Sequence, residues 1–511
     1  MALAFVSELL GLQDNKRVEI LGATHPAYTL FQPHATVLVD AYDGSGGFLN
    51  GAYLWRYPRE KEDEYGDRQK QARYHNYVET LVDLYVRKVF AQGVKRTTTN
   101  PELEAWWEGV DGSGTTLDTF MRQVAAIGLA AGYLGVLVDK TPETAKGPSR
   151  ADEKGRVFLS RYTPNAMLDW RYQRDTLTAI KLLEQETPES IVAPRPDDDA
   201  LKRYLIWTED GWARFQHDKG TLVSQDEPGL GVVPFDVFHP KRSARYAFVG
   251  KSLCGNANVI KALYNRASEE DEVLRDQAFS LLVITLPPDA NVQEAKNLLG
   301  QEIGTTRALF VKGTADFRTA DMGVPKAIRE NQDYLVKEIY RMAHMRFTRD
   351  SLDAESGDSI RMQHDELNDM LQGVAAECTR IEQAIARYWF HWMRATTEQA
   401  EAEYQAAEVT AEYPREFFLK DLEVELKAWA DAIAFELGDT FTKRIKKRVV
   451  RRVDPDIPQQ ELKVIDQEIE AQPAPLTEDE KLQQRQETMR AALQGRPPVK
   501  ADGDDPVVAA A

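Results

Sequence analysis

Hydrophobic residues recur at helical spacing early in the chain and then give way to the short alternating runs that are typical of strands. An apolar stripe predicts one long helix over residues 65–90, and a second apolar run predicts a helix over residues 117–132. Residues 157–238 carry short strand signals separated by turns. Within them, residues 203–208 and 213–216 flank a Glu-Asp-Gly-Trp turn and predict a hairpin.

The middle of the chain predicts two helices that are separated by a small α/β segment. The first helix spans about residues 256–279, with apolar residues at near-heptad spacing, and the second spans about residues 325–345. Between them we expect a strand at 281–286, a short helix at 292–299 and a strand at 308–312.

The strongest periodic signal predicts a long helix over residues 359–395, about 55 Å in length at 1.5 Å per residue. Its apolar positions alternate steps of four and three residues: Leu367, Leu371, Val374, Cys378, Ile381, Ile385, Tyr388 and Trp392. Packing alone explains this stripe, so we interpret it as architecture. Further helices are expected at 419–437, at 458–472 and from Thr477 to about Gly495, before a disordered Pro-rich end.

Composition narrows the class of protein. The chain has 511 residues, 42% hydrophobic and 29% charged, which predicts a globular protein of two or three domains. Its net charge of −18 argues against tight DNA binding, which needs surface Lys and Arg, but suits a surface past which DNA moves without sticking. Two isolated cysteines exclude a disulfide framework and favour a reducing cytoplasm. The start lacks a signal peptide, and the most apolar stretch, 124–138, is shorter than the ~20 residues that span a bilayer, so no membrane is expected.

The sequence contains only partial matches to known catalytic and phosphate-binding motifs. Gly250-Lys251-Ser252 resembles the end of a phosphate-binding loop, but Arg245 stands where that motif needs glycine. Asp43-Gly-Ser-Gly-Gly47 and Asp111-Gly-Ser-Gly114 indicate ordinary turns. The histidines show no metal-binding spacing: His25, His34, His75, His217, His239, His344, His364 and His391. We therefore expect no enzymatic activity, no cofactor and no metal site, while a site assembled from distant residues stays open.

One basic block stands out near the C-terminus. Seven of its ten residues are basic: Lys443, Arg444, Lys446, Lys447, Arg448, Arg451 and Arg452. Such a cluster could face nucleic acid. It could also pair with the acidic stretches on either side, 398–408 and 461–470. The negative net charge favours pairing within or between subunits, and the nucleic-acid alternative stays open.

Several stretches, taken with the order of elements, resemble the portal proteins of tailed double-stranded DNA bacteriophages. Residues 64–77 are similar to the early helix of one portal family, with Tyr-x-x-Arg and Ala-x-Tyr-x-Asn before a helix that ends in Val-Phe at 89–90. Residues 162–170 are similar to a short segment ending in Asp-Trp, and Val233-Pro-Phe before a long helix matches in kind. The resemblance covers about residues 15–470 and is carried by the ordered set, since no single motif is diagnostic.

The resemblance implies an α+β portal fold with an α/β wing, a helical stem, a small α/β clip, a tunnel loop and a helical crown. The expected parts are a wing at 1–254, a first stem helix at 255–279, a clip at 280–323, a second stem helix at 324–346, a tunnel loop at 347–359, a long wing helix at 360–400, a helical crown at 401–472 and a polar, partly disordered tail at 473–511. The tail departs from the family pattern.

The same resemblance implies a structural function. Portal proteins form rings, dodecameric in assembled virions, at one vertex of the capsid, and the ring is the conduit for genome packaging and ejection. The implied partners are further copies of the chain, the terminase large subunit, a head-completion or adaptor protein, the major capsid or scaffolding protein, and double-stranded DNA in transit. The protein would be assembled in the host cytoplasm and reside in the virion. Packing around a ring would bury the apolar stripes of the stem helices.

The expected tunnel loop and its edges carry a mixed and mostly acidic set of residues: Arg346, Arg349, Asp350, Asp353, Glu355 and Asp358. We expect such a channel surface to repel phosphates enough to keep friction low, while a few Arg or Lys make transient contacts. Two alternatives stay open. One is a virion scaffold or adaptor that assembles through its long helices without a channel, and the other is an enzyme with a dispersed site.

Overall fold

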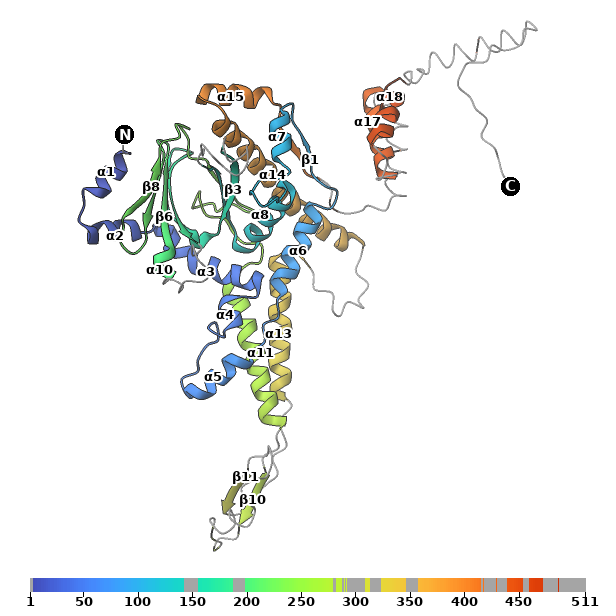
Figure 1. Ribbon diagram of the computed structural model, residues 1–511. Helices are drawn as coiled ribbons and strands as arrows, with labels where there is room; N and C mark the ends of the chain where they lie inside the picture. The colour runs from blue at the N-terminus through green and yellow to red at the C-terminus, as the bar shows by residue number, and fades with distance from the viewer. Residues whose placement is uncertain are drawn as a thin grey trace. The chain divides into compact units, whose positions relative to one another are not determined.

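The computed structural model describes most of the chain and divides it into two units. The described residues are 3–141, 155–186, 198–278, 282–286, 289, 291, 308–312, 323–345, 357–414, 417, 429, 439–453, 459–471 and 486. The first unit spans residues 1–417 and the second spans residues 418–511. The first unit mixes helices and sheets (Figure 1), as the sequence pattern predicts.

Two antiparallel sheets form the body of the first unit. A three-stranded sheet has the order β3-β2-β9, and a five-stranded meander has the order β4-β5-β6-β7-β8. The strands are β2 Leu134–Lys140, β3 Val157–Tyr162, β4 Met167–Gln173, β5 Thr176–Gln185, β6 Lys202–Thr208, β7 Trp212–Gln216, β8 Leu222–Asp226 and β9 Phe235–Phe238. The predicted hairpin is confirmed as β6 and β7, which pair antiparallel with Trp207 opposite Trp212.

One apolar core joins the two sheets. Trp207 of β6, Ile180 of β5 and Phe235 of β9 belong to the same buried cluster and are at most 2% exposed. Helices α8 (Leu117–Ala131) and α14 (Gly357–Met393) contact strands β2 and β9 of the three-stranded sheet. The three-stranded sheet is therefore buried by helices as well as by the second sheet, which explains why β2 is a continuous apolar run.

The predicted helix at 117–132 is confirmed as α8, and its end is fixed by a glycine. Gly132 caps the helix in the left-handed conformation, with φ of 96°. A Cβ atom at this position would lie 2.7 Å from the backbone nitrogen of Ser252. The chain needs glycine at position 132 because the backbone of Lys251 and Ser252 packs directly against the end of the helix. The segment Gly250-Lys251-Ser252, which resembles part of a phosphate-binding loop, therefore has a packing role.

The predicted single helix over residues 65–90 is wrong, because the chain breaks it in two. Helix α5 spans Glu62–Gln71 and helix α6 spans Tyr77–Val89. Between them the Asn76 side chain accepts a hydrogen bond from the Glu79 backbone N–H at 2.9 Å and caps α6. The break also lets Tyr74 stack on Phe48, with ring centroids 4.2 Å apart. Capping and aromatic burial therefore outweigh the continuous helical pattern.

The remaining short elements of the first unit surround the body. They are α1 Ala4–Leu10, α2 Asp14–Gly22, α3 Pro26–Asp43, α4 Gly46–Leu49, β1 Lys95–Thr97, α7 Pro101–Trp106, η1 Pro164–Ala166, α10 Asp198–Leu201, α15 Thr397–Ala406 and β12 Thr410–Glu412. Strand β1 pairs antiparallel with β12, and α15 packs on α14. Segments far apart in the sequence are thus joined near the long helix α14.

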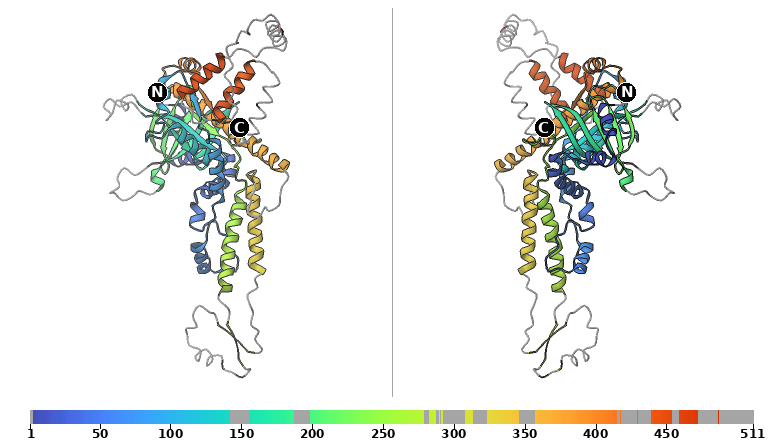
Figure 2. Two further views of the ribbon diagram at one scale, coloured as in Figure 1. Left: turned by 90° about the vertical axis from the view of Figure 1, so that its right-hand side faces the viewer. Right: turned by 90° about the vertical axis from the view of Figure 1, so that its left-hand side faces the viewer.

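Two helices project from the body as an antiparallel pair (Figure 2), α11 (Ala257–Ala278) and α13 (Gly323–Met342). In the sequence, the strands β10 (Leu282–Leu286) and β11 (Ala308–Lys312) lie between the two helices. The two strands pair with each other in parallel. The two long helices and the two strands predicted for this region, and the long helix α14, are confirmed. The predicted short helices at 292–299 and after Thr477 fall outside the described residues, with Gln486 the exception.

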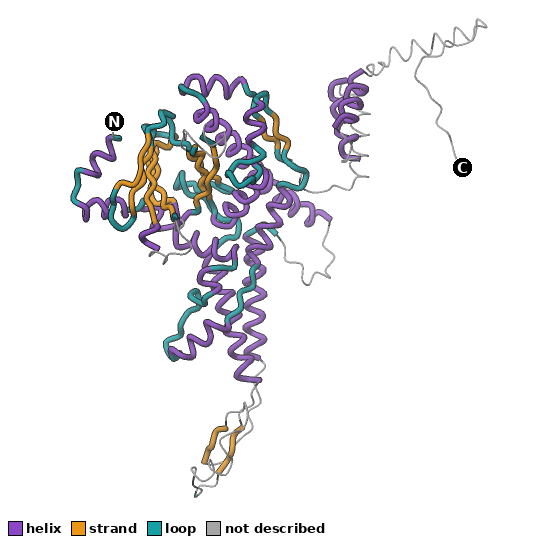
Figure 3. The backbone as a smooth tube through the Cα atoms, viewed as in Figure 1, coloured by secondary structure: helices purple, strands orange, loops and turns teal. Residues whose placement is uncertain are grey.

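The second unit contains a pair of helices, α17 (Asp439–Val453) and α18 (Gln459–Ala471), which pack on each other. Helix α18 confirms the prediction for residues 458–472. The helix expected at 419–437 lies outside the described residues apart from Trp429. Figure 3 shows these helices and the sheets of the first unit by type of secondary structure.

Candidate functional site

The candidate functional site is the helix pair α11 and α13, which we call the stem pair, together with the segment that holds it. At 1.5 Å per residue the two helices of 22 and 20 residues are about 30 Å long. Residues Leu282–Leu286 begin four positions after the end of α11. The paired strands β10 and β11 must therefore lie near the end of the stem pair that is distant from Cys254, since the chain connection is so short.

A polar ladder fixes the register of the stem pair. Arg329 of α13 donates to Glu270 of α11 at 2.6 Å, and the Gln332 amide donates to the same carboxylate at 2.9 Å. Gln332 also donates to the Arg266 carbonyl oxygen at 3.1 Å. The Glu270 side chain is 13% exposed, so these hydrogen bonds hold a partly buried carboxylate and penalise sliding of one helix along the other.

The apolar stripes of the stem pair are buried within the chain at some positions and partly exposed at others, such as Leu274, Ile328 and Leu335, so the expectation that a ring buries them stays a prediction. Ile260 and Leu263 of α11 are 2% and 6% exposed, and Ile339 of α13 is 1% exposed. Their cover comes from the partner helix and from the body. Val324 at the start of α13 and Tyr334 further along it are 46% and 59% exposed.

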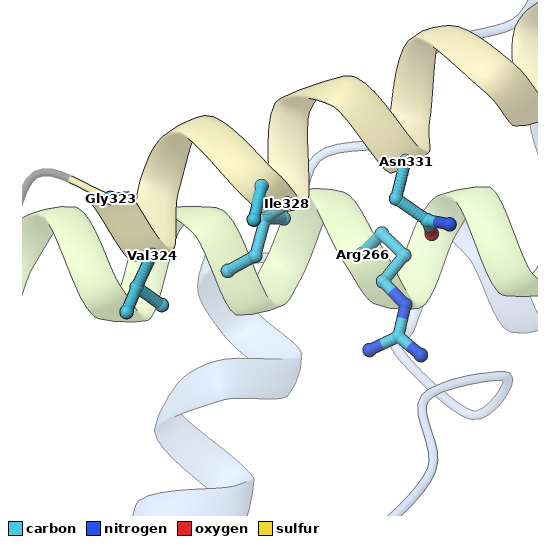
Figure 4. A pocket seen from close by; sticks show the side chains of 6 residues that line it. Arg266, Gly323, Val324, Ile328 and Asn331 are labelled. Carbon is cyan, nitrogen blue, oxygen red and sulfur yellow. The ribbon is translucent and has the colours of Figure 1, made fainter.

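An open groove of about 410 Å³ lies beside Val324. It is lined by Arg266, Gly323, Val324, Ala327, Ile328 and Asn331. Figure 4 shows the α13 side chains Val324, Ile328 and Asn331 alongside Arg266 of α11. The stem pair therefore leaves apolar surface uncovered at the end near β10 and β11, within the part of the chain that the structure describes.

A segment that we call the clasp (residues 53–71) packs against α11 and forms hydrogen bonds with it. Asn265 of α11 is 0% exposed; its amide donates to the Tyr53 carbonyl oxygen at 3.1 Å and accepts from the Trp55 N–H at 2.7 Å. Arg68 is 3% exposed and donates to both carboxylate oxygens of Glu60, at 2.6 and 2.8 Å. The buried Asn265 hydrogen bonds tie the clasp to the first stem helix, and the charge-assisted hydrogen bonds between Arg68 and Glu60 hold the clasp itself together.

Further contacts extend the clasp along α11. The Arg68 guanidinium reaches the Ser268 hydroxyl at 3.5 Å, and Arg73, just beyond the clasp, donates to Asp271 at 3.1 Å. Tyr57 donates a hydrogen bond to Glu269. Residues Glu269, Glu270, Asp271 and Glu272 of α11 are therefore engaged by neighbouring cations and hydroxyl groups.

The residues that carry the resemblance are the ones that build this attachment. In the Tyr-x-x-Arg motif, Tyr65 donates to the Leu54 carbonyl oxygen at 2.9 Å and Arg68 binds Glu60. In the Ala-x-Tyr-x-Asn motif, Tyr74 donates to the Ala41 carbonyl oxygen at 2.9 Å and Asn76 caps α6. Both motifs therefore position the clasp and the break between α5 and α6.

The other two matching stretches lie in the body. Asn165 accepts a hydrogen bond from Thr36 at 2.7 Å, and Trp170 stacks between His25 and Phe248 with centroid distances of 4.2 and 4.0 Å. Pro234, within the Val-Pro-Phe stretch, accepts a backbone hydrogen bond from Val138 at 2.9 Å. These stretches pack the two sheets against α3 and are structural.

The expected tunnel-loop residues are largely beyond the described part of the chain. Arg346, Arg349, Asp350, Asp353 and Glu355 fall outside it. Asp358 lies in the first turn of α14. Their role in a channel stays a prediction.

The basic block lies on helix α17 in the second unit. All seven residues fall within it: Lys443, Arg444, Lys446, Lys447, Arg448, Arg451 and Arg452. The Lys447 ammonium lies 2.6 Å from the Glu470 carboxylate of α18, and Lys443 donates to the Glu470 carbonyl oxygen at 3.0 Å. The structure thus brings part of the block together with one end of the acidic stretch 461–470.

Sequence reasoning missed a buried ion pair on α14. Arg96 of β1 donates to both carboxylate oxygens of Glu382, at 2.8 and 2.7 Å, and Glu382 is 5% exposed. Tyr413 donates to the same carboxylate. The available signal was a carboxylate directly after Ile381 on the apolar side of the stripe, where a charge needs a partner.

The described residues contain neither a candidate metal cluster nor a candidate membrane span. No group of three or more His, Cys, Asp or Glu side chains among them is placed to hold a metal ion. No described helix is both long enough and apolar enough to cross a membrane. Asp111 organises a turn by accepting backbone hydrogen bonds from Ser113 at 2.9 Å and Thr115 at 3.1 Å, which matches the expected role of that glycine-rich stretch.

Comparison with known proteins adds a distant structural likeness. No family model matches the chain, and no curated protein matches it. Among solved structures, the chain is similar to a chain described as "Virion of native gene transfer agent (GTA) particle", at 12% sequence identity and a TM-score of 0.35. The alignment covers 71% of this chain and 86% of that chain.

Proposed function

We propose that this protein is a phage portal protein, which forms a ring at one capsid vertex and conducts the genome during packaging and ejection. The observation that carries the proposal is the sequence of elements around the stem pair. An α/β body leads into α11, a small pair of strands follows, α13 returns, and a 37-residue helix α14 comes next. This is the order that the resemblance to portal proteins implies.

The attachment of the stem pair supports the same proposal. The helices that form the wall of a DNA channel must keep their relative positions while DNA passes and other proteins dock. The ladder between Arg329 and Glu270 and the clasp around Asn265 give the stem pair this rigidity. The groove beside Val324 leaves apolar surface that a further subunit can cover.

The proposal includes the partners and the absence of enzymatic activity. The terminase large subunit would dock near β10 and β11 during packaging, and a head-completion or adaptor protein would replace it afterwards. The ring would contact the major capsid or scaffolding protein around it and double-stranded DNA within it. Catalysis would belong to the terminase, and the protein itself would need no cofactor.

The first experiment is negative-stain imaging of the purified full chain, with its mass in solution measured by light scattering. We expect rings of about a dozen subunits with a central hole, because head-to-tail contacts between two complementary surfaces of each subunit form a ring when their rotation closes. The mass should correspond to the number of subunits counted in the images.

Other assembly states would contradict the portal proposal. A stable monomer or dimer, both alone and when co-expressed with its scaffolding protein, would contradict the portal proposal and favour an adaptor without a channel. Open filaments would show head-to-tail contacts that do not close, which also contradicts a vertex ring.

A further inference from the structure

Three segments of the first unit meet at the C-terminal end of α14. Nδ1 of His391 lies 3.3 Å from the backbone carbonyl oxygen of Leu230, which belongs to the connection between β8 and β9. Nε2 of the same ring lies 2.9 Å from a carboxylate oxygen of Glu401 on α15. Thr397, the first residue of α15, donates to the same Leu230 oxygen at 3.2 Å. His391 therefore joins α14, α15 and the β8–β9 connection at one point.

Both ring nitrogens of His391 face oxygen atoms that can only accept hydrogen bonds. A backbone carbonyl oxygen has no proton to donate, and neither has an ionised carboxylate. Although burial opposes it, the hydrogen bonds from His391 and Arg387 hold the pKa of Glu401 below its usual range, so this carboxylate is ionised. A neutral imidazole has one N–H and can satisfy only one of the two oxygens. The arrangement therefore fits the imidazolium form of His391, in a side chain that is 1% exposed.

The other groups beside this junction keep their charge when the pH changes. Arg387 of α14 donates to the same Glu401 oxygen at 2.5 Å, and arginine stays charged at any physiological pH. Burial raises the pKa of Tyr404 on α15, so its hydroxyl group stays neutral. Histidine is the side chain whose charge ordinarily changes between about pH 5 and pH 8. His391 is therefore the group at this junction that can respond to pH.

The elements that pack against α14 and α15 carry further charged or titratable groups. They are Glu102 of α7, Arg394 after α14, Glu403 of α15, Asp139 of β2, Asp236 of β9 and His239 after β9. All of them remain when His391 alone is replaced. A comparison of the unchanged protein with a His391 variant therefore isolates the contribution of this one ring.

We propose that His391, Glu401 and the Leu230 carbonyl oxygen form a proton-dependent latch that holds α15 to the body of the first unit. The charged ring donates to both oxygens at once, whereas loss of its proton leaves a nitrogen lone pair facing one of them. A proton on His391 favours the closed latch, so the latch holds at low pH and weakens as the pH rises. Strand β12, which follows α15, stays paired with β1 and confines the loosening to α15. The latch depends on the local fold and not on the portal proposal.

Hydrogen exchange with mass spectrometry on the full chain tests the latch at about pH 5 and about pH 8. Labelling times are scaled for the faster chemical exchange of amides at the higher pH. Peptides from α15 and from the residues around Leu230 report on the latch, and peptides from α8 are the internal reference. The test variant is His391→Gln, which is neutral at both pH values and keeps a hydrogen-bond donor. The matched control is His34→Gln, at an exposed position of α3.

In the unchanged protein, we expect α15 to exchange about tenfold faster at the higher pH, relative to α8. Release of one proton can raise the opening constant by at most about tenfold per pH unit, so an effect of this size is within reach. His34→Gln should behave like the unchanged protein. In His391→Gln, the relative exchange of α15 should be the same at both pH values.

Glu401→Gln is a second variant, which removes the anion that favours the charged ring. It should also reduce the pH dependence of α15, and it decides the question if His391→Gln does not fold.

Three results would overturn the inference. The first is relative exchange of α15 that does not depend on pH in the unchanged protein. The second is a pH dependence in His391→Gln or in Glu401→Gln that equals that of the unchanged protein. The third is an equal response of α15 and α8, which would indicate a change of stability throughout the body. Ring formation is measured separately, so loss of this inference leaves the portal proposal standing.

Discussion

At the scale of single residues, Asp139 is a buried carboxyl group with an unusual pKa. It lies on β2 and is 8% exposed. Burial raises its pKa to about 6, and the negative charge of Glu184 adds to the increase, while Arg214 and the Lys140 N–H oppose it. The ionised form is therefore unfavourable inside the body.

This residue makes the stability of the body depend on pH. The folded state holds the Asp139 proton more tightly than the unfolded chain, so its stabilising effect is complete below about pH 4 and is lost as the pH rises through about 6. Asp139→Asn should raise the free energy of unfolding by about 3 kcal/mol at pH 8 and change it little at pH 4. Thermal unfolding at both pH values measures this.

The exposed Asp175 provides the control for this prediction. Asp175→Asn should leave the unfolding midpoint nearly unchanged at both pH values. A stabilisation by Asp139→Asn of the same size at pH 4 and pH 8 would show that ionisation of Asp139 is not its cause.

Some residues of the site could be predicted from the sequence, and others could not. The spacing of Ile260, Leu263 and Ala267 identified the buried side of α11 without any structure. Asn265 interrupts that side as a polar residue, but local spacing cannot reveal that its partners are Tyr53 and Trp55, more than two hundred residues earlier. Local periodicity reports burial, whereas the partner of a buried polar group is set by the tertiary fold.

At the scale of elements, the clasp shows the same limit. Helical periodicity continued through residues 72–76, yet the cap at Asn76 and the burial of Tyr74 ended α5 and started α6 anew. The benefit of the break comes from contacts with Phe48 and Ala41, which belong to other elements. Tertiary contacts therefore override a local pattern that is correct in its period.

The clasp also provides a prediction at this scale. Arg68→Met removes the partner of Glu60, whose side chain is 12% exposed, and leaves a nearly buried carboxylate unpaired. Local opening of the clasp should become easier, and amides of residues 53–71 should exchange hydrogen about tenfold faster or more. Hydrogen exchange with mass spectrometry measures this, with peptides from α8 as the internal reference.

Lys70→Met is the matched control, because Lys70 lies on the same helix and pairs with Asp67 at an exposed position. Its exchange should resemble that of the unchanged protein. Equal acceleration in peptides from α8 would contradict a local role for Arg68, since it would indicate loss of stability throughout the body.

At the scale of the whole molecule, the order of elements could be predicted and their attachments could not. The strand-rich body, the stem pair and the long helix α14 each have a local periodic signal. Their mutual fixation depends on pairs such as Arg96 and Glu382, which lie 286 residues apart in the sequence. Such pairs are set by the completed fold, so a sequence shows at most that a charged residue falls on an apolar stripe.

The pair of Arg96 and Glu382 gives the last prediction, because it joins β1, α14 and the residues after β12. Their side chains are 12% and 4% exposed. Arg96→Met should lower the free energy of unfolding of the body by about 3–5 kcal/mol, since Glu382 is left buried without a counter-charge. The double variant Arg96→Met with Glu382→Gln should be more stable than Arg96→Met alone, because the lone charge is gone. The midpoints of thermal unfolding measure both effects, and Arg87→Met at an exposed position is the control. Additive losses of stability in the double variant would contradict the prediction. They would mean that the two side chains act independently and that apolar packing alone holds the long helix to the body.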